Sequence, residues 1–143
     1  LRSGTLNVPG IVGFGGACSL AANLLESESL KLTDLRTRLW NRIKLAIPKA
    51  KLNGSEIERL PGHLSFFVPG LDATRMVQEL PDIALSLGAA CSSNSSVPSH
   101  VLTAMGRSIY ETNATLRIGL GRFSTKDEVD YIAQSIVNFS NDF

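Results

Sequence analysis

Cys91 lies in a stretch of small and polar residues, 88–99, that directly follows the apolar residues 83–87. The side chains around it are too small to bury the thiol, so we expect an accessible sulfur. A free thiol with an ordinary pKa of about 8.5 is partly ionised at neutral pH, and the thiolate is the nucleophilic form. The residues alone leave two interpretations open: a reactive thiol, or a small apolar side chain at the end of a strand.

Arg117 is the second side chain that could do chemistry. It lies in residues 115–120, where the even-numbered apolar residues share one face of an expected strand, so that Arg117 faces the other way with Gly119 beside it. The space next to a glycine admits a planar partner, and the guanidinium group matches the two oxygens of a carboxylate. Taken alone, the pattern favours the simpler alternative of an arginine on a solvated sheet face.

Other candidate residues give weaker signals. Arg122 follows the same strand, and we expect it to brace the turn before the last helix. His63 and His100 have no metal-like partner at a workable spacing, so the sequence predicts no zinc site. No Ser/His/Asp arrangement, phosphate-binding lysine loop or dinucleotide fingerprint is present. No strand precedes the glycine-rich residues 13–16, which therefore fit a close helix contact better than a phosphate loop.

The composition indicates one soluble globular unit, with 143 residues, 43% hydrophobic residues and a net charge of +1. Because no dense cluster of Lys and Arg occurs, we expect neither nucleic acid nor a membrane as a partner. Cys18 and Cys91 lie in dissimilar contexts, which argues against a disulfide framework and for a reducing compartment, here the cytoplasm.

Two features of the chain bear on its completeness and on membrane insertion. We find no run of about 18 apolar residues and no signal peptide. The first residue is not Met, and the chain enters motif-like sequence at once. We therefore expect a fragment of a longer protein.

Helical periodicity is clearest at the two ends of the chain. Apolar residues recur at helical spacing over 11–25 and again over 32–47, so the two patterns could form one long, interrupted helix. Near the other end, Thr125 and Glu128 form a Thr-x-x-Glu capping box that predicts the start of the last helix.

Between them the sequence predicts short elements. Strands are expected over 50–52, 64–68, 83–87 and 115–120, and short helices after the capping residue Asp72 and over 99–105. Strands that are separated by helices favour the α/β class, here a two-layer domain.

Several segments, taken together and in order, resemble the cysteine desulfurases, which are pyridoxal-phosphate (PLP) enzymes of the aminotransferase class V-like family. These enzymes supply sulfur for iron–sulfur clusters and thiolated cofactors. Each motif is weak alone, but the ordered set is specific and covers essentially the whole chain. The segments are Arg2-Ser3-Gly4-Thr5, Asn7-Val8-Pro9, Ile11-Val12-Gly13, Gly88-Ala89-Ala90-Cys91-Ser92-Ser93, Pro98-Ser99-His100-Val101-Leu102, Ala104-Met105-Gly106 and Leu116-Arg117-Ile118-Gly119-Leu120-Gly121-Arg122-Phe123-Ser124-Thr125.

The resemblance implies the PLP fold type I, or aminotransferase-like, architecture. Residues 1–25 would be the end of the large PLP-binding domain with its bridging helix, and residues 26–143 the C-terminal small domain. The Schiff-base lysine, its neighbouring histidine and the aspartate that pairs with the pyridine nitrogen would belong to the large domain. We therefore expect the chain alone neither to hold PLP properly nor to turn over L-cysteine.

The resemblance also assigns roles to three residues. Cys91 matches the catalytic cysteine, which takes sulfur from L-cysteine as a persulfide while L-alanine is released. Arg117 matches the arginine that binds the substrate carboxylate, which reverses the preference stated above. Thr5 matches the threonine that, in a homodimer, reaches the PLP phosphate held by the neighbouring subunit. A sulfur acceptor or iron–sulfur scaffold protein would be a further partner, and no metal is expected.

Departures from the family pattern keep two alternatives open. The sequence Leu87-Gly88-Ala89-Ala90-Cys91 replaces the more usual Ser-Gly-Ser-Ala-Cys, and alanine-rich forms also occur in selenocysteine lyases. The other alternative is a noncatalytic module that associates through the helix over 11–25. The chain ends at Phe143, without the longer tail that some relatives use to dock a scaffold protein. We therefore do not expect docking through such a tail.

Overall fold

The structure is a computed structural model that describes residues 3–87 and 98–141. Helices and strands alternate along the chain, as expected for the α/β class. Their bounds are α1 (Val8–Ala46), β1 (Lys51–Leu52), β2 (His63–Phe67), α2 (Ala73–Glu79), β3 (Ser86–Leu87), α3 (His100–Ala104), α4 (Ile109–Asn113), β4 (Thr115–Gly119) and α5 (Lys126–Asn141).

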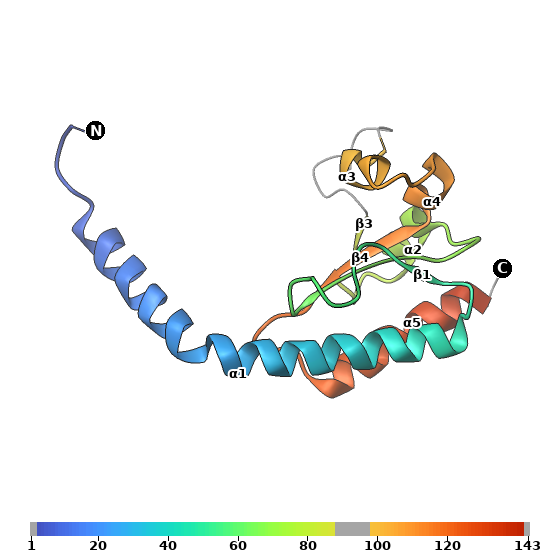
Figure 1. Cartoon of the computed structure of the whole chain (residues 1–143), viewed down its shortest axis with the longest axis horizontal. Helices are drawn as coiled ribbons and strands as arrows, with labels where there is room; N and C mark the ends of the chain where they lie inside the picture. The colour runs from blue at the N-terminus through green and yellow to red at the C-terminus, as the bar shows by residue number, and fades with distance from the viewer. Residues whose placement is uncertain (1–2, 88–97, 142–143) are drawn as a thin grey trace.

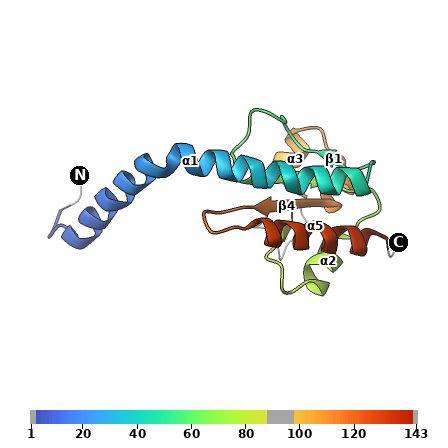
Figure 2. The same cartoon turned by 90° about the horizontal axis from the view of Figure 1, so that it is seen from below.

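The strands form one antiparallel sheet in the order β1-β2-β4-β3. α1 and α5 lie side by side along one face of this sheet, while α3 and α4 lie on its other side (Figures 1 and 2). The central strands, β2 and β4, therefore carry some side chains that point toward α1 and α5 and others that point to the opposite side.

The hydrophobic core lies between the sheet and the two long helices. Successive residues of a strand point to opposite faces, so the even-numbered residues of β2 and β4 point into this core. The indole ring of Trp40 on α1 packs against the ring of Phe66, with 5.8 Å between the ring centroids. The largest fully buried apolar side chains are Leu39, Ile43, Leu64, Phe66, Val68, Met76, Leu116, Val129 and Ile136.

α1 is one continuous helix of 39 residues, where the sequence predicted an interruption. Asn7 caps it by accepting a hydrogen bond from the backbone N–H of Gly10 at 3.2 Å. Residues 8–23 are exposed, and the buried residues Leu35, Leu39 and Ile43 all lie in the second half. Figures 1 and 2 show the first half projecting beyond the rest of the molecule. We call residues 8–25 the N-terminal arm.

The arm is apolar although it is exposed. α1 contains an 18-residue window with a mean hydropathy of 1.5 that is 0% buried, which is long and apolar enough to cross a membrane by length and composition alone. The sequence analysis identified no such segment. This single helix is weak evidence for a membrane span, because helices of soluble proteins can pass the same test.

Ion pairs tie the second half of α1 to the end of the chain. Arg38 donates two hydrogen bonds of 2.7 Å to the carboxylate of Asp130 on α5. Arg122, in the turn after β4, pairs with Glu28 on α1, and its backbone carbonyl accepts a hydrogen bond from Lys31. The expectation that Arg122 braces this turn is confirmed.

Two short elements differ from the sequence predictions. β3 has two residues instead of five, and before it the backbone N–H of Leu85 donates locally to the carbonyl of Ile83 at 2.8 Å. α4 was not predicted, although Ser108 and Glu111 form a complete capping box at its start. The predicted capping box is present, with mutual hydrogen bonds of Thr125 and Glu128, and so are the strands predicted elsewhere.

Truncating the core should show that α1 is held by its second half. Leu39 is 0% exposed, whereas Leu45 on the same helix is 84% exposed. We expect Leu39→Ala to lower the free energy of unfolding by about 2–5 kcal/mol, measured by urea denaturation. Leu45→Ala is the matched control and should change it by less than about 0.5 kcal/mol. Equal losses in the two variants would contradict this packing.

The Arg38–Asp130 pair should make stability depend on pH. The hydrogen bonds from Arg38 hold the pKa of Asp130 below its ordinary value of 3.8. A lowered folded-state pKa stabilises the fold above the unfolded value, and this advantage disappears as the pH falls through the folded pKa. Asp130→Asn should therefore be less stable than the unmodified chain at pH 7, and the difference should vanish in acid.

Urea midpoints measured between pH 7 and pH 2 would check this. Asp34→Asn, an exposed aspartate of α1, serves as the control. A difference between Asp130→Asn and the parent chain that stays constant over this range would show that the pair does not act through its charge.

Candidate functional site

β4 places Arg117 on the face of the sheet that points away from α1 and α5. Its neighbours Leu116 and Ile118 are 0% and 2% exposed in the core, and Arg117 between them is half-buried. On the opposite side of the sheet, Tyr110 of α4 packs against Phe67 at the end of β2. We call the remaining part of this side, with His63 and Ser65 of β2 and Arg117 and Gly119 of β4, the open face. The orientation of Arg117 predicted from the alternation of β4 is therefore found.

The strand register fixes the neighbours of Arg117. Ser65 of β2 lies directly across from it on one side and Ser86 of β3 on the other. Gly119 lies across from His63, and among the described residues, its own chain neighbours apart, no heavy atom comes within 4 Å of where its Cβ would be. The space that the sequence predicted beside Arg117 is thus present.

Arg117 forms no ion pair with Asp or Glu within residues 3–87 and 98–141. A half-buried guanidinium group without a carboxylate partner is unusual, because partial burial weakens its hydration. The open face therefore offers a cation to an external anion.

A buried polar network lies beside Arg117. Asn53, which is 5% exposed, donates hydrogen bonds from Nδ2 to Ser65 Oγ at 3.2 Å and to Thr115 Oγ1 at 3.4 Å. Thr115 in turn donates to the carbonyl of Glu111 at 2.7 Å. Arg59 donates to the backbone carbonyl of Asn53 at 2.9 Å. These bonds connect the 53–59 segment to β2 and β4 and fix the floor of the open face.

His63 belongs to the same face, although from the sequence it was considered only as a metal ligand and rejected. It is half-buried at the start of β2. Burial, followed by the nearby charges of Arg59 and Arg117, lowers the pKa of its imidazole below the ordinary histidine value. His63 is therefore neutral at pH 7 and carries one N–H donor and one nitrogen acceptor.

Gly62 fixes the position of His63. A Cβ at Gly62 would lie 2.3 Å from the backbone oxygen of Leu120, and the N–H of Leu120 donates to the carbonyl of Gly62 at 2.8 Å. The backbone N–H of His63 donates to the carbonyl of Leu60 at 3.1 Å. The start of β2 is thus held close to the end of β4 by the backbone alone.

Cys91 lies outside the described residues, which stop at Leu87 and resume at Pro98. The residue that precedes it by five positions, Ser86, lies directly across from Arg117. Five extended residues span at most about 18 Å. The chain that carries Cys91 therefore leaves the described structure beside Arg117.

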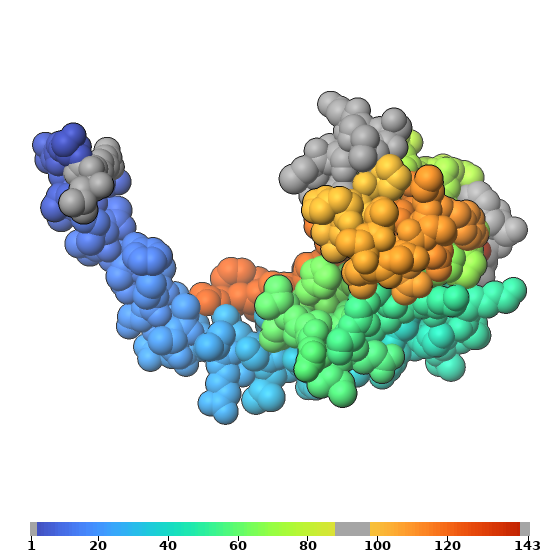
Figure 3. Space-filling view, turned by 45° about the horizontal axis from the view of Figure 1, so that its top comes forward, coloured from blue at the N-terminus to red at the C-terminus, as the bar shows by residue number. Residues whose placement is uncertain are grey.

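Thr5 is not brought together with Arg117. It is exposed just before α1, and Figures 1 and 2 show this end of the chain far from β4. Figure 3 shows a hollow between the N-terminal arm and the rest of the molecule. The helical glycines Gly13, Gly15 and Gly16 meet no other atom within 4 Å, so nothing described here makes the close contact that the sequence predicted for them.

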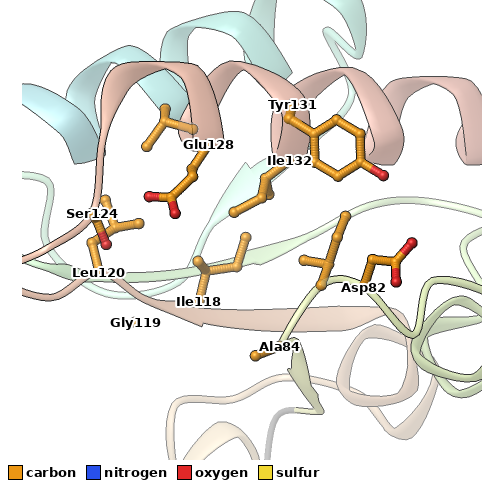
Figure 4. A pocket seen from close by; sticks show the side chains of 11 residues that line it. Asp82, Ala84, Ile118, Gly119, Leu120, Ser124, Glu128, Tyr131 and Ile132 are labelled. Carbon is orange, nitrogen blue, oxygen red and sulfur yellow. The ribbon is translucent and has the colours of Figure 1, made fainter.

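A separate cavity of about 240 Å³ lies between α5, the end of β4 and the segment before β3 (Figure 4). Its walls are apolar at Ile118 and Ile132, and the carboxylates of Asp82 and Glu128 lie at its edge. Glu128 is already engaged in the capping box with Thr125. Neither Arg117 nor Thr5 lines this cavity.

Metal chemistry has no support within the described part of the chain. Residues 3–87 and 98–141 contain no group of three or more His, Cys, Asp or Glu side chains that could hold a metal ion. Cys18 is a free, exposed cysteine on the N-terminal arm, and His100 is exposed at the start of α3.

The family model for aminotransferase class V matches residues 1–132. The chain therefore belongs to the aminotransferase class-V family, and the resemblance and fold class drawn from the sequence are confirmed. Solved structures agree with this. The NifS-like protein of Rickettsia africae ESF-5 superposes with a TM-score of 0.81 at 27% identity, covering 98% of this chain and 36% of that chain. A second NifS-like protein gives a TM-score of 0.82 at 29% identity, covering 100% of this chain and 36% of that chain.

The curated relatives indicate a more specific class of enzyme within this family. The chain is 44% identical over 130 residues to the cysteine desulfurase IscS of Anaeromyxobacter sp. (strain K), covering 91% of this chain and 32% of that protein. It is 36% identical over 138 residues to the cysteine desulfurase of Rattus norvegicus, covering 96% of this chain and 31% of that protein. The chain thus spans about a third of the length of these relatives.

Proposed function

We propose that this chain is the C-terminal part of a PLP-dependent cysteine desulfurase. The whole protein would move sulfur from L-cysteine onto Cys91 as a persulfide and release L-alanine, for iron–sulfur cluster and thio-cofactor synthesis. Cysteine desulfurases are the relatives to which the chain is similar. The single structural observation that carries the proposal is Arg117, a half-buried arginine on the open face with no acidic partner in the described part of the chain.

Arg117 would bind the α-carboxylate of L-cysteine. A guanidinium group and a carboxylate form two parallel charge-assisted hydrogen bonds, which fix the orientation of the substrate as well as its affinity. The absence of a side chain at Gly119 leaves room for the amino acid beside the guanidinium group. Bound in this way, the substrate would have a defined direction in which its side-chain sulfur points.

Cys91 would collect the sulfur. Its thiolate attacks the sulfur of L-cysteine and forms an S–S bond, while the Cβ–S bond of the substrate breaks. The electron pair of that bond stays with the carbon, which takes up a proton and leaves as L-alanine. The sulfur remains on Cys91 as a persulfide for transfer to an acceptor protein. The proximity of Ser86 to Arg117 supports this role, because Cys91 follows Ser86 by only five residues.

PLP would be bound mainly by the large domain, with Thr5 contributing to the phosphate site of a neighbouring subunit in a homodimer. Thr5 is exposed and far from Arg117, so the residues of one chain do not by themselves bring the two together. A hydroxyl group and backbone N–H groups are suitable donors to a phosphate. When bound, PLP withdraws electrons from the amino acid and so weakens its bonds.

We also propose the division at residue 25 and the cytoplasmic location that the sequence suggested. The division is supported by burial, because residues 8–23 are exposed and the core residues of α1 begin at Leu35.

One relative, from Arthroderma benhamiae, is named a mitochondrial cysteine desulfurase, so the reducing compartment could differ between relatives. We attribute the apolar surface of the arm to contact with other protein. Both NifS-like structures align with nearly all of this chain, yet this chain matches only 36% of each, so each contains further protein beyond the matched part.

Replacing the two cysteines separately would test the proposal in the protein that carries this chain together with its large domain. We expect Cys91→Ser to reduce sulfide release from L-cysteine at least about 100-fold, because the oxygen cannot accept the sulfur, and to leave PLP absorbance unchanged. Cys18→Ser, on the exposed arm, is the matched control and should retain full activity. Sulfide release that persists in Cys91→Ser would contradict the assignment.

The same assay addresses the selenocysteine alternative, which the alanine-rich sequence before Cys91 leaves open. Release of L-alanine would be followed with L-cysteine and with L-selenocysteine. Preference for L-selenocysteine together with independence from Cys91 would identify a selenocysteine lyase instead.

A second candidate function is a noncatalytic association module. Its supporting observation is the arm, on which Phe14 is 73% exposed and Leu25 is 67% exposed. An exposed apolar surface of this kind drives association in water. Under this candidate the chain pairs with a second copy or with the absent domain and performs no chemistry.

Light scattering of the chain alone would test this candidate. We expect dimers or larger species, and we expect Phe14→Asp to shift them toward monomer because it places a charge on the arm. Leu45→Asp, an exposed leucine outside the arm, is the control and should not change the mass. A stable monomer at high protein concentration would count against the association module.

A further inference from the structure

The geometry points to His63 as a second recognition residue for the substrate carboxylate, donating an N–H hydrogen bond beside the guanidinium group of Arg117. The inference rests on the proposed function, and it adds a substrate-binding residue from β2 beside Arg117 of β4.

The first support is the register of the two central strands. His63 lies across from Gly119 and Ser65 lies across from Arg117, so His63 and Arg117 are diagonal neighbours on one face. Diagonal neighbours in an antiparallel pair lie about 7–8 Å apart, within reach of long side chains. The residue directly across from His63 has no side chain, so a small molecule can lie between the imidazole and the guanidinium group.

The second support is that the position of His63 is fixed from both sides. The close backbone approach of Gly62 to Leu120 holds the start of β2 against the end of β4, and the hydrogen bond from the backbone N–H of His63 to the carbonyl of Leu60 closes the turn that leads into β2. Ser65, the next residue on the same face, is held by Asn53. A donor on a fixed backbone costs little conformational entropy when it binds a ligand.

The third support is the charge around the imidazole. The groups that act on it are Arg59, from the segment before β2, and Arg117, from β4, and both are cations. No hydrogen bond or ion pair engages the His63 side chain within residues 3–87 and 98–141. Two cations beside a neutral N–H donor suit an anion with several acceptor positions. A carboxylate has these positions, since each oxygen accepts more than one hydrogen bond.

The arrangement divides the recognition between two kinds of group. Arg117 supplies the charge and two parallel donors, and His63 supplies one further, uncharged donor from the neighbouring strand. Because His63 is neutral at pH 7, it adds directional recognition without adding a third cation to the face. Truncating it should therefore weaken substrate binding more than it slows the chemical step.

A direct test uses NMR of the 143-residue chain, which contains only two histidines. The imidazole C2–H resonance of His63 would be followed during titration with L-alanine, which carries the α-carboxylate of the proposed product. We expect a saturable shift of the His63 resonance and a rise of its titration midpoint, because a bound anion favours the protonated imidazole. The exposed His100 serves as the internal reference and should not respond.

Two controls define the result. L-alaninamide has the same amine without the carboxylate and should produce no saturable shift. In Arg117→Gln the His63 midpoint should rise before any ligand is added, because a neighbouring cation has been removed, and the response to L-alanine should be lost. A His63 resonance that moves no more than that of His100, or that responds equally to L-alaninamide, would overturn the inference.

Kinetics of the protein with its large domain would test the role in turnover. We expect His63→Leu to raise KM for L-cysteine about 10-fold or more with kcat changed less than about 3-fold. His63→Gln retains an N–H donor and should keep KM within about 3-fold of the parent value. Equal KM values for the parent and both variants would overturn the inference while leaving the desulfurase function intact.

A failure of the proposed function can be distinguished from a failure of the inference about His63. If the parent protein does not release L-alanine from L-cysteine, the proposed function fails, and the NMR titration still decides whether His63 and Arg117 bind a carboxylate. If the parent protein is active and His63→Leu lowers kcat without raising KM, His63 acts in some way other than carboxylate recognition. Should His63→Leu fail to fold, His63→Gln and the titration of the parent chain carry the test.

Discussion

The structure depends on the way the pleat of β2 and β4 divides their side chains between two faces. The apolar members, Leu64 and Phe66 on β2 and Leu116 and Ile118 on β4, are buried against α1 and α5. This burial leaves their neighbours in the chain, including His63 and Arg117, on the open face. A slip of one residue in the pairing would exchange the two sets, so the core holds the candidate site in place.

Much of this arrangement follows from local patterns in the sequence. The alternation in β4 was enough to turn Arg117 away from the core, and the Thr125–Glu128 capping box located the start of α5. Ser108 and Glu111 form the same pattern before α4, so that helix could have been predicted from its capping box as well. The short length of β3 could not, because it depends on a local hydrogen bond between Leu85 and Ile83.

The environment of His63 could not be predicted from its own segment. Gly119 and Arg117 lie more than fifty residues further along the chain, and only the pairing of β2 with β4 brings them beside the imidazole. Local sequence also gave no reason to associate Asn53 with Ser65 and Thr115. Patterns of period two or 3.6 identify elements and their faces, whereas the partners across a sheet are set by the packing of the whole domain.

The N-terminal arm is the opposite case. Its apolar pattern indicates a surface that packs against other groups, but the described residues of this chain do not provide those groups. Its helical glycines are exposed, and so are its apolar residues except for the half-buried Leu24. The relatives are about three times as long as this chain, and the structures that share its fold include the same helix. The proposal that other protein packs on this helix rests on these two comparisons.

The unbroken course of α1 has a mechanical consequence. At about 1.5 Å per residue, its 39 residues extend roughly 58 Å, and every backbone hydrogen bond along them resists twisting. α1 bends between its first and second halves (Figures 1 and 2), but the helix is not interrupted, so the two halves remain mechanically connected. If a protein that packs on the first half of α1 moved it, the movement would pass to the second half and to the sheet that packs against it. The orientation of Arg117 on that sheet would then change as well.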